Sequence, residues 1–275
     1  MSIEAAPALA LADITCRFAN RDGRSEAYTA VAHASLTVAK GEFVSVVGPT
    51  GCGKSTLLNV AAGLLGPSSG TVAVFGTPLL AADGVNRRAG YMFQADALMP
   101  WRTGLDNVIA GLEFRGVARA EALAQGEEWL RRVGLAGFGD RYPHQMSGGM
   151  RKRLALAQTL ILSPDILLMD EPFSALDVQT RQLMENELLA LWAEDRKSVL
   201  FITHDLEEAI ALSDRVIVLS AGPATRPIGD FKVELPRPRD VLEIRMTPAF
   251  LDLHREIWAA MKEEVLKAYA QQRVG

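Results

Sequence analysis

A glycine-rich segment between a short apolar run and a helical pattern limits the possible folds more than any other part of the sequence. The apolar run, residues 43–47 (FVSVV), favours a strand, and residues 48–56 (GPTGCGKST) follow it directly. The next residues predict a helix with one apolar face, made by Leu57, Leu58, Ala61, Leu64 and Leu65. Strand, glycine-rich turn, Lys-Ser-Thr and helix, in this order, predict a phosphate-binding loop.

The residue types of this loop suit a polyphosphate. The glycines allow the backbone to curl so that its N–H groups point inward at a helix N-terminus. Lys54 adds a positive charge for the β- and γ-phosphates, and the Ser55 hydroxyl can ligate Mg²⁺. The predicted binding residues are Gly48, Pro49, Thr50, Gly51, Cys52, Gly53, Lys54, Ser55 and Thr56. The loop by itself does not separate ATP from GTP.

Two acidic residues follow a second predicted strand. Residues 166–169 are apolar, as in a strand buried on both faces of a parallel sheet, and Asp170 and Glu171 come next. Ligands of open α/β sheets bind at this carboxyl end. We therefore expect Asp170 to hold Mg²⁺, through water, and Glu171 to orient or deprotonate an attacking water. The alternative is a strand that ends in two solvated acids.

A third predicted strand, residues 199–203, ends at His204, and residues 206–216 (LEEAIALSDRV) follow as an amphipathic segment. His204 leaves the same sheet edge as Asp170, which favours a contact with a γ-phosphate. The alternative is an ordinary structural histidine.

Ser147, Gly148 and Gly149 form another glycine-rich turn before a predicted helix, whose apolar positions are Leu154, Ala157, Leu160 and Ile161. Such turns bind anions but are common. The order of the motifs is more specific. The phosphate-binding loop, Gln94, the Ser-Gly-Gly turn, Asp170-Glu171 and His204 follow one another as in ATP-binding-cassette (ABC) proteins, and the chain resembles this family from about residue 11 to residue 238.

The resemblance implies an α/β fold: a P-loop NTPase (RecA-like) core with an antiparallel β edge and an inserted α-helical subdomain. It implies that Gln94 senses Mg²⁺ and the attacking water, with Glu171 and His204 as the other catalytic residues. It also implies that residues 147–149 cap the γ-phosphate of ATP bound to a second copy, and that residues 174–177 (SALD) cross the dimer interface.

Two positions depart from the family pattern. Met150 replaces the usual glutamine after the Ser-Gly-Gly turn, and we expect this change to be tolerated because the serine hydroxyl and backbone N–H groups make the contacts attributed to this loop. Phe18 stands where a tyrosine usually stacks on adenine, and it keeps the aromatic face without the hydroxyl. Tyr28 competes for this role, and core packing is the alternative for Phe18.

The predicted elements divide the chain into three parts. Residues 1–94 and 166–234 alternate strands and helices as in a nucleotide-binding core, and residues 95–165 are mostly helical and carry the Ser-Gly-Gly turn. Residues 235–275 form a Pro/Arg linker and a helix. The apolar stripe of this helix, which packs on its own domain or binds a partner, is made by Phe250, Leu253, Ile257, Met261, Val265 and Tyr269.

Residues 98–101 (LMPW) would form an apolar patch on a loop after Gln94. They either fold back onto the helical part or, as the resemblance implies, form a groove for a short helix of a membrane subunit.

Composition narrows the partners. The net charge of −4 shows no basic excess for nucleic acid, and no run of about 18 apolar residues predicts a membrane span, so a pore would be a separate polypeptide. Cys16 and Cys52 form no metal-binding or disulfide pattern, which favours buried thiols in a reducing cytoplasm. Because one chain carries one set of motifs, the resemblance implies a homodimer that closes on two ATP molecules.

The resemblance is strongest to importer ATPases for nitrate, sulfonates, taurine and thiamine-precursor-like solutes. It implies an ATP- and Mg²⁺-dependent subunit on the cytoplasmic face of the cell membrane, bound to integral-membrane permease subunits and served by a periplasmic or extracellular solute-binding protein. One alternative is a soluble ABC-type ATPase in DNA repair or translation. Another is a regulatory protein with an inactive nucleotide site, which the intact Lys54, Glu171 and His204 disfavour.

Overall fold

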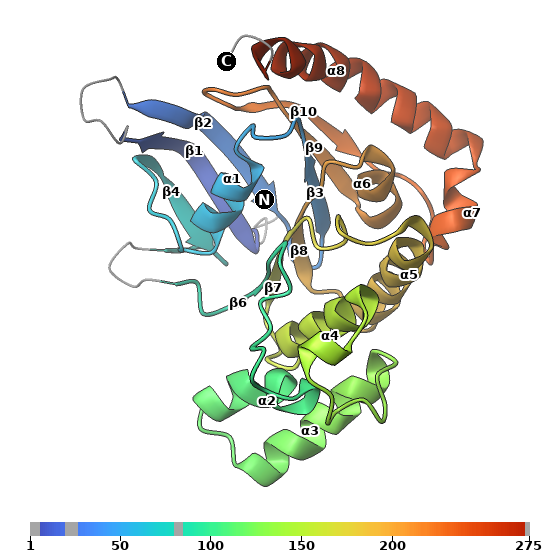
Figure 1. The fold of residues 1–275 in the computed structure, drawn as a ribbon. Helices are drawn as coiled ribbons and strands as arrows, with labels where there is room; N and C mark the ends of the chain where they lie inside the picture. Colours follow the sequence, from blue (N-terminus) through green and yellow to red (C-terminus); the bar gives the residue numbers. More distant parts are fainter. Residues whose placement is uncertain (1–5, 20–26, 80–84, 273–275) are drawn as a thin grey trace, which may run out of the picture.

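The computed structural model describes residues 6–19, 27–79 and 85–272, which form two sheets and their covering helices (Figure 1). The smaller sheet has four antiparallel strands. In spatial order they are β2 (Tyr28–Val38), β1 (Leu9–Phe18), β4 (Ser69–Val74) and β5 (Thr77–Pro78). This sheet is the antiparallel part of the predicted fold.

The larger sheet has six strands, five of them parallel, with an antiparallel edge strand. In spatial order they are β10 (Pro227–Lys232), β9 (Arg215–Leu219), β3 (Phe43–Val47), β8 (Ser198–Ile202), β7 (Ile166–Asp170) and β6 (Ala89–Met92). The central strands β3 and β8 are buried along their whole length, as their unbroken apolar runs predict. The predicted α/β class is confirmed.

Helices cover both faces of the larger sheet. On one face α1 (Lys54–Ala61) packs between the two sheets, in a core that includes Val44 and Val46 of β3. The alternate residues Phe43 and Val47 face a second core. This core contains residues of α5 (Val178–Asp195), α6 (Leu206–Leu212), α7 (Val241–Arg245) and α8 (Pro248–Gln272), and also Ala155, Leu156 and Leu160.

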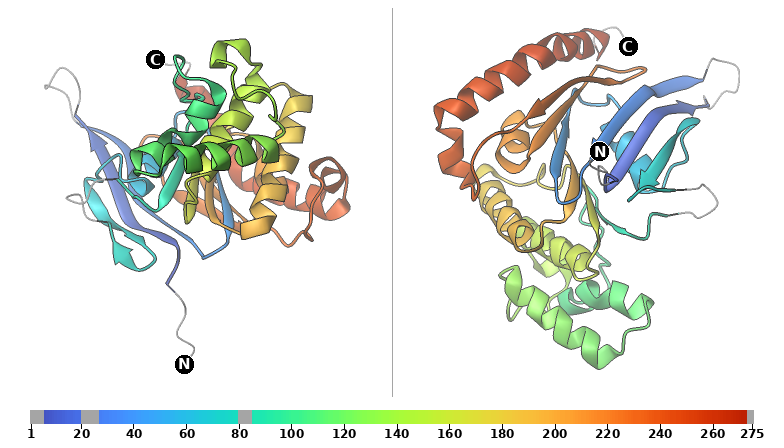
Figure 2. Two further views of the ribbon diagram at one scale, coloured as in Figure 1. Left: turned by 90° about the horizontal axis from the view of Figure 1, so that it is seen from below. Right: turned by 180° about the vertical axis from the view of Figure 1, so that it is seen from behind.

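Residues 95–165 are helical and form a core of their own. The helices are α2 (Gly104–Phe114), α3 (Arg119–Arg132), the short 3₁₀ helix η2 (Pro143–Gln145) and α4 (Gly148–Leu160). Gly126 allows α3 to approach α2, because a Cβ there would lie 2.4 Å from Ile109 Cγ2. Figure 2 shows α2 and α3 at the opposite end of the molecule from α8.

The helix predicted after the phosphate-binding loop ends earlier than expected. Helix α1 ends at Ala61 because Gly63 takes a left-handed φ of 70° and the Leu64 N–H donates to the Asn59 carbonyl, so Leu64 is 48% exposed instead of on the apolar face. The amphipathic segment 206–216 comprises α6, which ends at Leu212, and the first residues of β9. Between them the Asp214 backbone N–H donates to the Phe43 carbonyl.

The carboxyl-terminal stripe packs on its own domain. Phe250, Ile257 and Met261 are buried against the second core, whereas Tyr269 is 55% exposed. Cys16 and Cys52 are free and buried, as expected, and burial raises the pKa of both thiols. Within the described ranges, no helix is both long enough and apolar enough to cross a membrane.

Candidate functional site

The turn between β3 and α1 has the backbone of an anion-binding loop. Gly51 and Gly53 take φ values of 77° and 106°, which residues with a Cβ rarely adopt. Gly48 has little room for a side chain, because a Cβ there would lie 3.1 Å from both Cys52 Sγ and Leu219 Cβ. The close packing and left-handed turns hold the backbone in the curled form that directs N–H groups toward a phosphate.

Lys54 lies within this loop and is only 5% exposed. Its Nζ donates hydrogen bonds to the carbonyl oxygens of Gly48, at 2.9 Å, and Pro49, at 3.1 Å. Both acceptors are neutral, so a triphosphate would supply the negative charge that favours a buried ammonium group. The loop therefore fits a polyphosphate.

A hydroxyl and a carboxylate meet beside the loop. Ser55, in the first turn of α1, donates its Oγ hydrogen to Asp170 Oδ1 at 3.0 Å. Burial raises the pKa of Asp170, and the neighbouring Glu171 raises it further. A divalent cation would favour the charged carboxylate, and hydroxyl and carboxylate oxygens are the ligands that Mg²⁺ prefers.

Glu171, directly after β7, has a constrained backbone. Its φ of 42° lies in the left-handed region, where a residue with a Cβ is strained. Its N–H donates to the Ile202 carbonyl at 2.9 Å, and its carbonyl accepts from the Ser174 Oγ hydrogen at 3.0 Å. Such strain is typical of functional positions, and here hydrogen bonds to β8 and to the following turn maintain it.

Two further predicted residues meet the Glu171 carboxylate. His204 Nδ1 lies 3.0 Å from Glu171 Oε2, and Gln94 Nε2 donates to the same oxygen at 3.5 Å. Gln94 follows β6, Glu171 follows β7 and His204 follows β8. Because these strands are parallel neighbours, their carboxyl ends lie together. The result is a carboxylate that can accept a proton, held by two polar groups near the phosphate-binding loop.

The Ser-Gly-Gly turn, residues 147–149, lies away from the phosphate-binding loop (Figure 1). Ser147 is exposed and caps α4, its Oγ accepting from the Met150 N–H at 3.3 Å. A Cβ on Gly149 would lie 2.8 Å from Thr180 Cγ2, so the start of α4 packs against α5. In the described part of the chain no hydrogen bond or ion pair joins residues 147–149 to residues 48–56, and Figure 1 places α4 apart from α1.

Both candidates for adenine stacking lie together at one strand end. Phe18 and Tyr28 are cross-strand partners of β1 and β2 and are 39% and 45% exposed. Strand β2 passes close to the phosphate-binding loop, since a Cβ on Gly53 would lie 3.2 Å from Val31 Cγ2. The structure thus places two exposed rings on the strands beside the loop.

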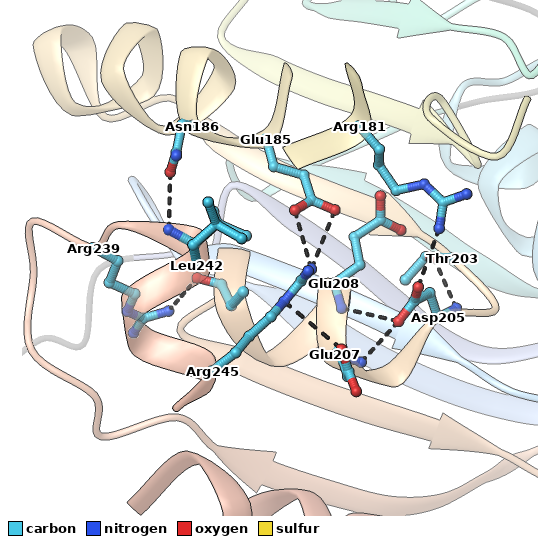
Figure 3. Close-up of polar contacts among 12 residues, drawn as sticks. Arg181, Glu185, Asn186, Thr203, Asp205, Glu207, Glu208, Arg239, Leu242 and Arg245 are labelled. Atoms are coloured by element: carbon cyan, nitrogen blue, oxygen red, sulfur yellow. Dashed lines mark hydrogen bonds and ion pairs between the residues drawn. The ribbon is translucent and has the colours of Figure 1, made fainter. Parts of the chain in front are cut away.

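The sequence analysis missed an ionic cluster around Asp205, the residue after His204 (Figure 3). Asp205 caps α6 and pairs with Arg181 of α5, while the fully buried Glu185 pairs with Arg245 of α7 at 3.0 Å. Burial is the main cause that raises the pKa of Glu185 to about 7 and that of Glu208 to about 8. One signal was available: Glu208 lies in an otherwise largely apolar helix, LEEAIAL.

This cluster predicts a pH-dependent stability. Glu208 faces Glu185, Asp205, Arg181 and Thr203, and its pKa rises on folding from 4.5 to about 8. Glu208 therefore binds a proton more tightly in the folded chain than in the unfolded chain. The stabilisation that comes from protonated Glu208 is complete below pH 4.5 and is lost as the pH rises to about 8. The glutamine of Glu208→Gln stays neutral at every pH. Denaturant titrations should therefore show a free energy of unfolding that falls less steeply with pH than in the wild type, by at most about 1.4 kcal/mol per pH unit.

The control is Glu207→Gln, since Glu207 lies on the same helix with a side chain 56% exposed. It should keep the wild-type pH dependence. Identical curves for Glu208→Gln and the wild type would contradict the assignment.

Three kinds of comparison with known proteins point to the same family. The family model described as ABC transporter matches residues 31–174. An uncharacterized ABC transporter ATP-binding protein of Methanocaldococcus jannaschii is 46% identical over 234 residues, which cover 85% of each chain. The taurine import ATP-binding protein of Rhizobium johnstonii is 42% identical over 248 residues, covering 89% of this chain and 92% of that protein.

Among solved structures, the chain is similar to the dimeric post-hydrolysis state of the ATP-binding cassette MJ0796 bound to ADP and Pi. The TM-score is 0.72 and the identity 31%, and the match covers 83% of this chain and 100% of that chain.

Proposed function

This chain belongs to the ABC transporter family and is an ATPase of the importer type, and we propose that it couples ATP hydrolysis to solute import through a separate permease. The observation that carries the proposal is the convergence of Gln94 and His204 on Glu171 beside the phosphate-binding loop. A regulatory protein with an inactive nucleotide site would not need this arrangement.

In the proposed mechanism Lys54 and the N–H groups of the loop bind the β- and γ-phosphates, and water attacks the γ-phosphate in line. Glu171 orients this water or accepts its proton. Because His204 Nδ1 faces Glu171, its other ring nitrogen is left for the γ-phosphate. Mg²⁺ held by Ser55, Asp170 and Gln94 would supply positive charge next to the phosphate oxygens.

We propose that the active site is completed by a second copy. Residues 147–149 belong to the helical residues 95–165, which we propose to be one subdomain, and not to the surroundings of their own phosphate-binding loop. A homodimer would bring this turn onto the γ-phosphate held by the partner, with residues 174–177 at the interface. The similar solved cassette is dimeric, which supports this arrangement. Either Phe18 or Tyr28 would stack on the adenine.

The permease is proposed to dock on the helical part. Leu98 packs partly against the cores, but Trp101 is 74% exposed and Phe114 is 78% exposed. A cavity of about 290 Å³ is lined by Phe114 together with Phe93 and Met99. A short amphipathic helix of an integral-membrane subunit would cover these rings.

The remaining parts of the proposal follow from the importer type. The chain would act peripherally on the cytoplasmic face of the cell membrane, and a solute-binding protein outside would deliver the solute. Since one similar protein is a taurine import ATPase, the proposed solute class is that of nitrate, sulfonates, taurine and thiamine precursors.

The variant Trp101→Ala tests the docking surface and the importer assignment together. We expect the detergent-solubilised permease to stimulate wild-type turnover, and Trp101→Ala to keep the basal turnover but lose most of the stimulation, because the permease helix loses the exposed ring that it would cover. ATPase assays with and without permease measure both. Leu266→Ala, which removes an apolar side chain 58% exposed from α8, is the control and should be stimulated normally.

Normal stimulation of Trp101→Ala would contradict the docking surface. Stimulation by DNA or ribosomes, without any response to permease, would support the soluble alternative instead.

A further inference from the structure

One arginine joins the loop after Glu171 to the loop that carries His204. Arg181, in the first turns of α5, donates from Nη2 to the Leu176 carbonyl at 3.1 Å and from Nη1 to Asp205 Oδ2 at 3.3 Å. Leu176 belongs to the segment 174–177, and Asp205 directly follows His204. Figure 3 shows the Arg181 side chain directed at Asp205.

The Asp205 end of this bridge is rigid. Asp205 Oδ1 accepts from the N–H groups of Glu207, at 2.9 Å, and Glu208, at 3.2 Å, so the carboxylate is fixed to the start of α6. Its own N–H donates to Thr203 Oγ1 at 3.0 Å. A displacement of Asp205 would therefore displace the backbone next to His204.

The Leu176 end is also fixed. Leu176 is 7% exposed, and its N–H donates to the Phe173 carbonyl at 3.1 Å. The same turn is tied to the backbone of Glu171, since Ser174 donates to the Glu171 carbonyl from its backbone N–H and from its hydroxyl. Arg181 thus spans the two loops whose side chains meet in the contact between Glu171 and His204.

We propose that Arg181 is a positioning residue for hydrolysis: by holding the Leu176 carbonyl and the Asp205 carboxylate together, it sets His204 against Glu171. This inference rests on the proposed dimer, because residues 174–177 would touch the second copy. When the second copy contacts this segment, a displacement of Leu176 would move Arg181 and, through Asp205, His204. Dimer closure would in this way align His204 with Glu171.

A purely structural role makes a different prediction. Arg181 also lies near the buried Glu185 and Glu208 and could act only by balancing their charge. Arg245 does this for Glu185 through two hydrogen bonds, of 3.0 and 3.3 Å. It comes from α7 and binds Glu185 and Glu207, not Leu176 or Asp205, which makes Arg245→Ala the matched control.

The test is steady-state ATP hydrolysis by Arg181→Ala, Arg181→Lys and Arg245→Ala, with melting temperatures measured in parallel. For Arg181→Ala we expect kcat to fall by about 10- to 100-fold, with KM for ATP within about twofold of the wild type, because the substrate is bound but the catalytic groups are misplaced. Arg181→Lys should restore part of kcat, since one ammonium group can hold one of the two acceptors at a time. Arg245→Ala should lower the melting temperature and keep kcat.

A kcat for Arg181→Ala within about twofold of the wild type would overturn the inference, as would an equal loss in Arg245→Ala. Should Arg181→Ala fail to fold, Asp205→Asn replaces it, because the amide oxygen can still cap α6 while the charge that binds Arg181 is gone. Its kcat should fall in the same way, and an unchanged kcat would overturn the inference. A wild-type chain that does not hydrolyse ATP would contradict the proposed function instead.

Discussion

Replacing Glu171 by glutamine is expected to slow ATP hydrolysis by about two to four decades while ATP still binds. The amide keeps the size of the side chain and can still contact Gln94 and His204, but it cannot accept a proton from the attacking water. Lys54 and the loop backbone, which we propose to hold the triphosphate, are unchanged. Bound ATP should therefore persist, and an ATP-dependent dimer should become easy to trap.

Single-turnover kinetics and light scattering with ATP measure these two effects. Glu207→Gln is the matched control, because Glu207 is an exposed carboxylate near the same sheet edge and should keep wild-type turnover. Unchanged hydrolysis in Glu171→Gln would refute the role of this carboxylate.

Replacing Lys54 by alanine is expected to weaken ATP binding by about 10- to 100-fold and to remove measurable turnover. Charge-assisted hydrogen bonds contribute about 1.5–3 kcal/mol each, and the buried Nζ would exchange its two carbonyl partners for phosphate oxygens. The same charge is needed more strongly in the transition state, where negative charge moves onto the leaving group.

Calorimetric titration with ATP, in a Glu171→Gln background that slows turnover, measures the affinity. Lys40→Ala removes an exposed lysine on the turn before β3 and should bind ATP normally. An affinity of Lys54→Ala within about twofold of its parent would show that the loop backbone alone carries the binding.

The parts of the fold that the sequence predicts well are those specified locally. Residues 43–47 form β3 exactly as expected, because an unbroken apolar run bounded by glycine admits few alternatives. The shared edge of Asp170, Glu171 and His204 follows from the geometry of parallel strands, and the structure places the three residues there. The place of Gln94 at the site had no local signal and was expected only from the family resemblance, which did not predict its contact with Glu171.

The parts that could not be predicted depend on contacts between distant segments. Their residue type predicts that Glu185 and Glu208 are exposed, because carboxylates are rarely buried, but α5, α6 and α7 meet around them and bury both side chains. Arg181 is likewise an ordinary charged residue in sequence, and its bridge exists only because the Leu176 turn and the start of α6 lie together. The early end of α1 was missed because Gly63 was counted as part of the helix.

The central claim is that the hydrolytic site is shared between two copies of the chain. Turnover per chain, measured against chain concentration with the oligomeric state followed by sedimentation, tests it most directly. Below the concentration at which dimers form, we expect turnover per chain to rise in proportion to concentration, because the Ser-Gly-Gly turn must come from a partner. A monomer that hydrolyses ATP at a constant, full rate per chain would contradict the account.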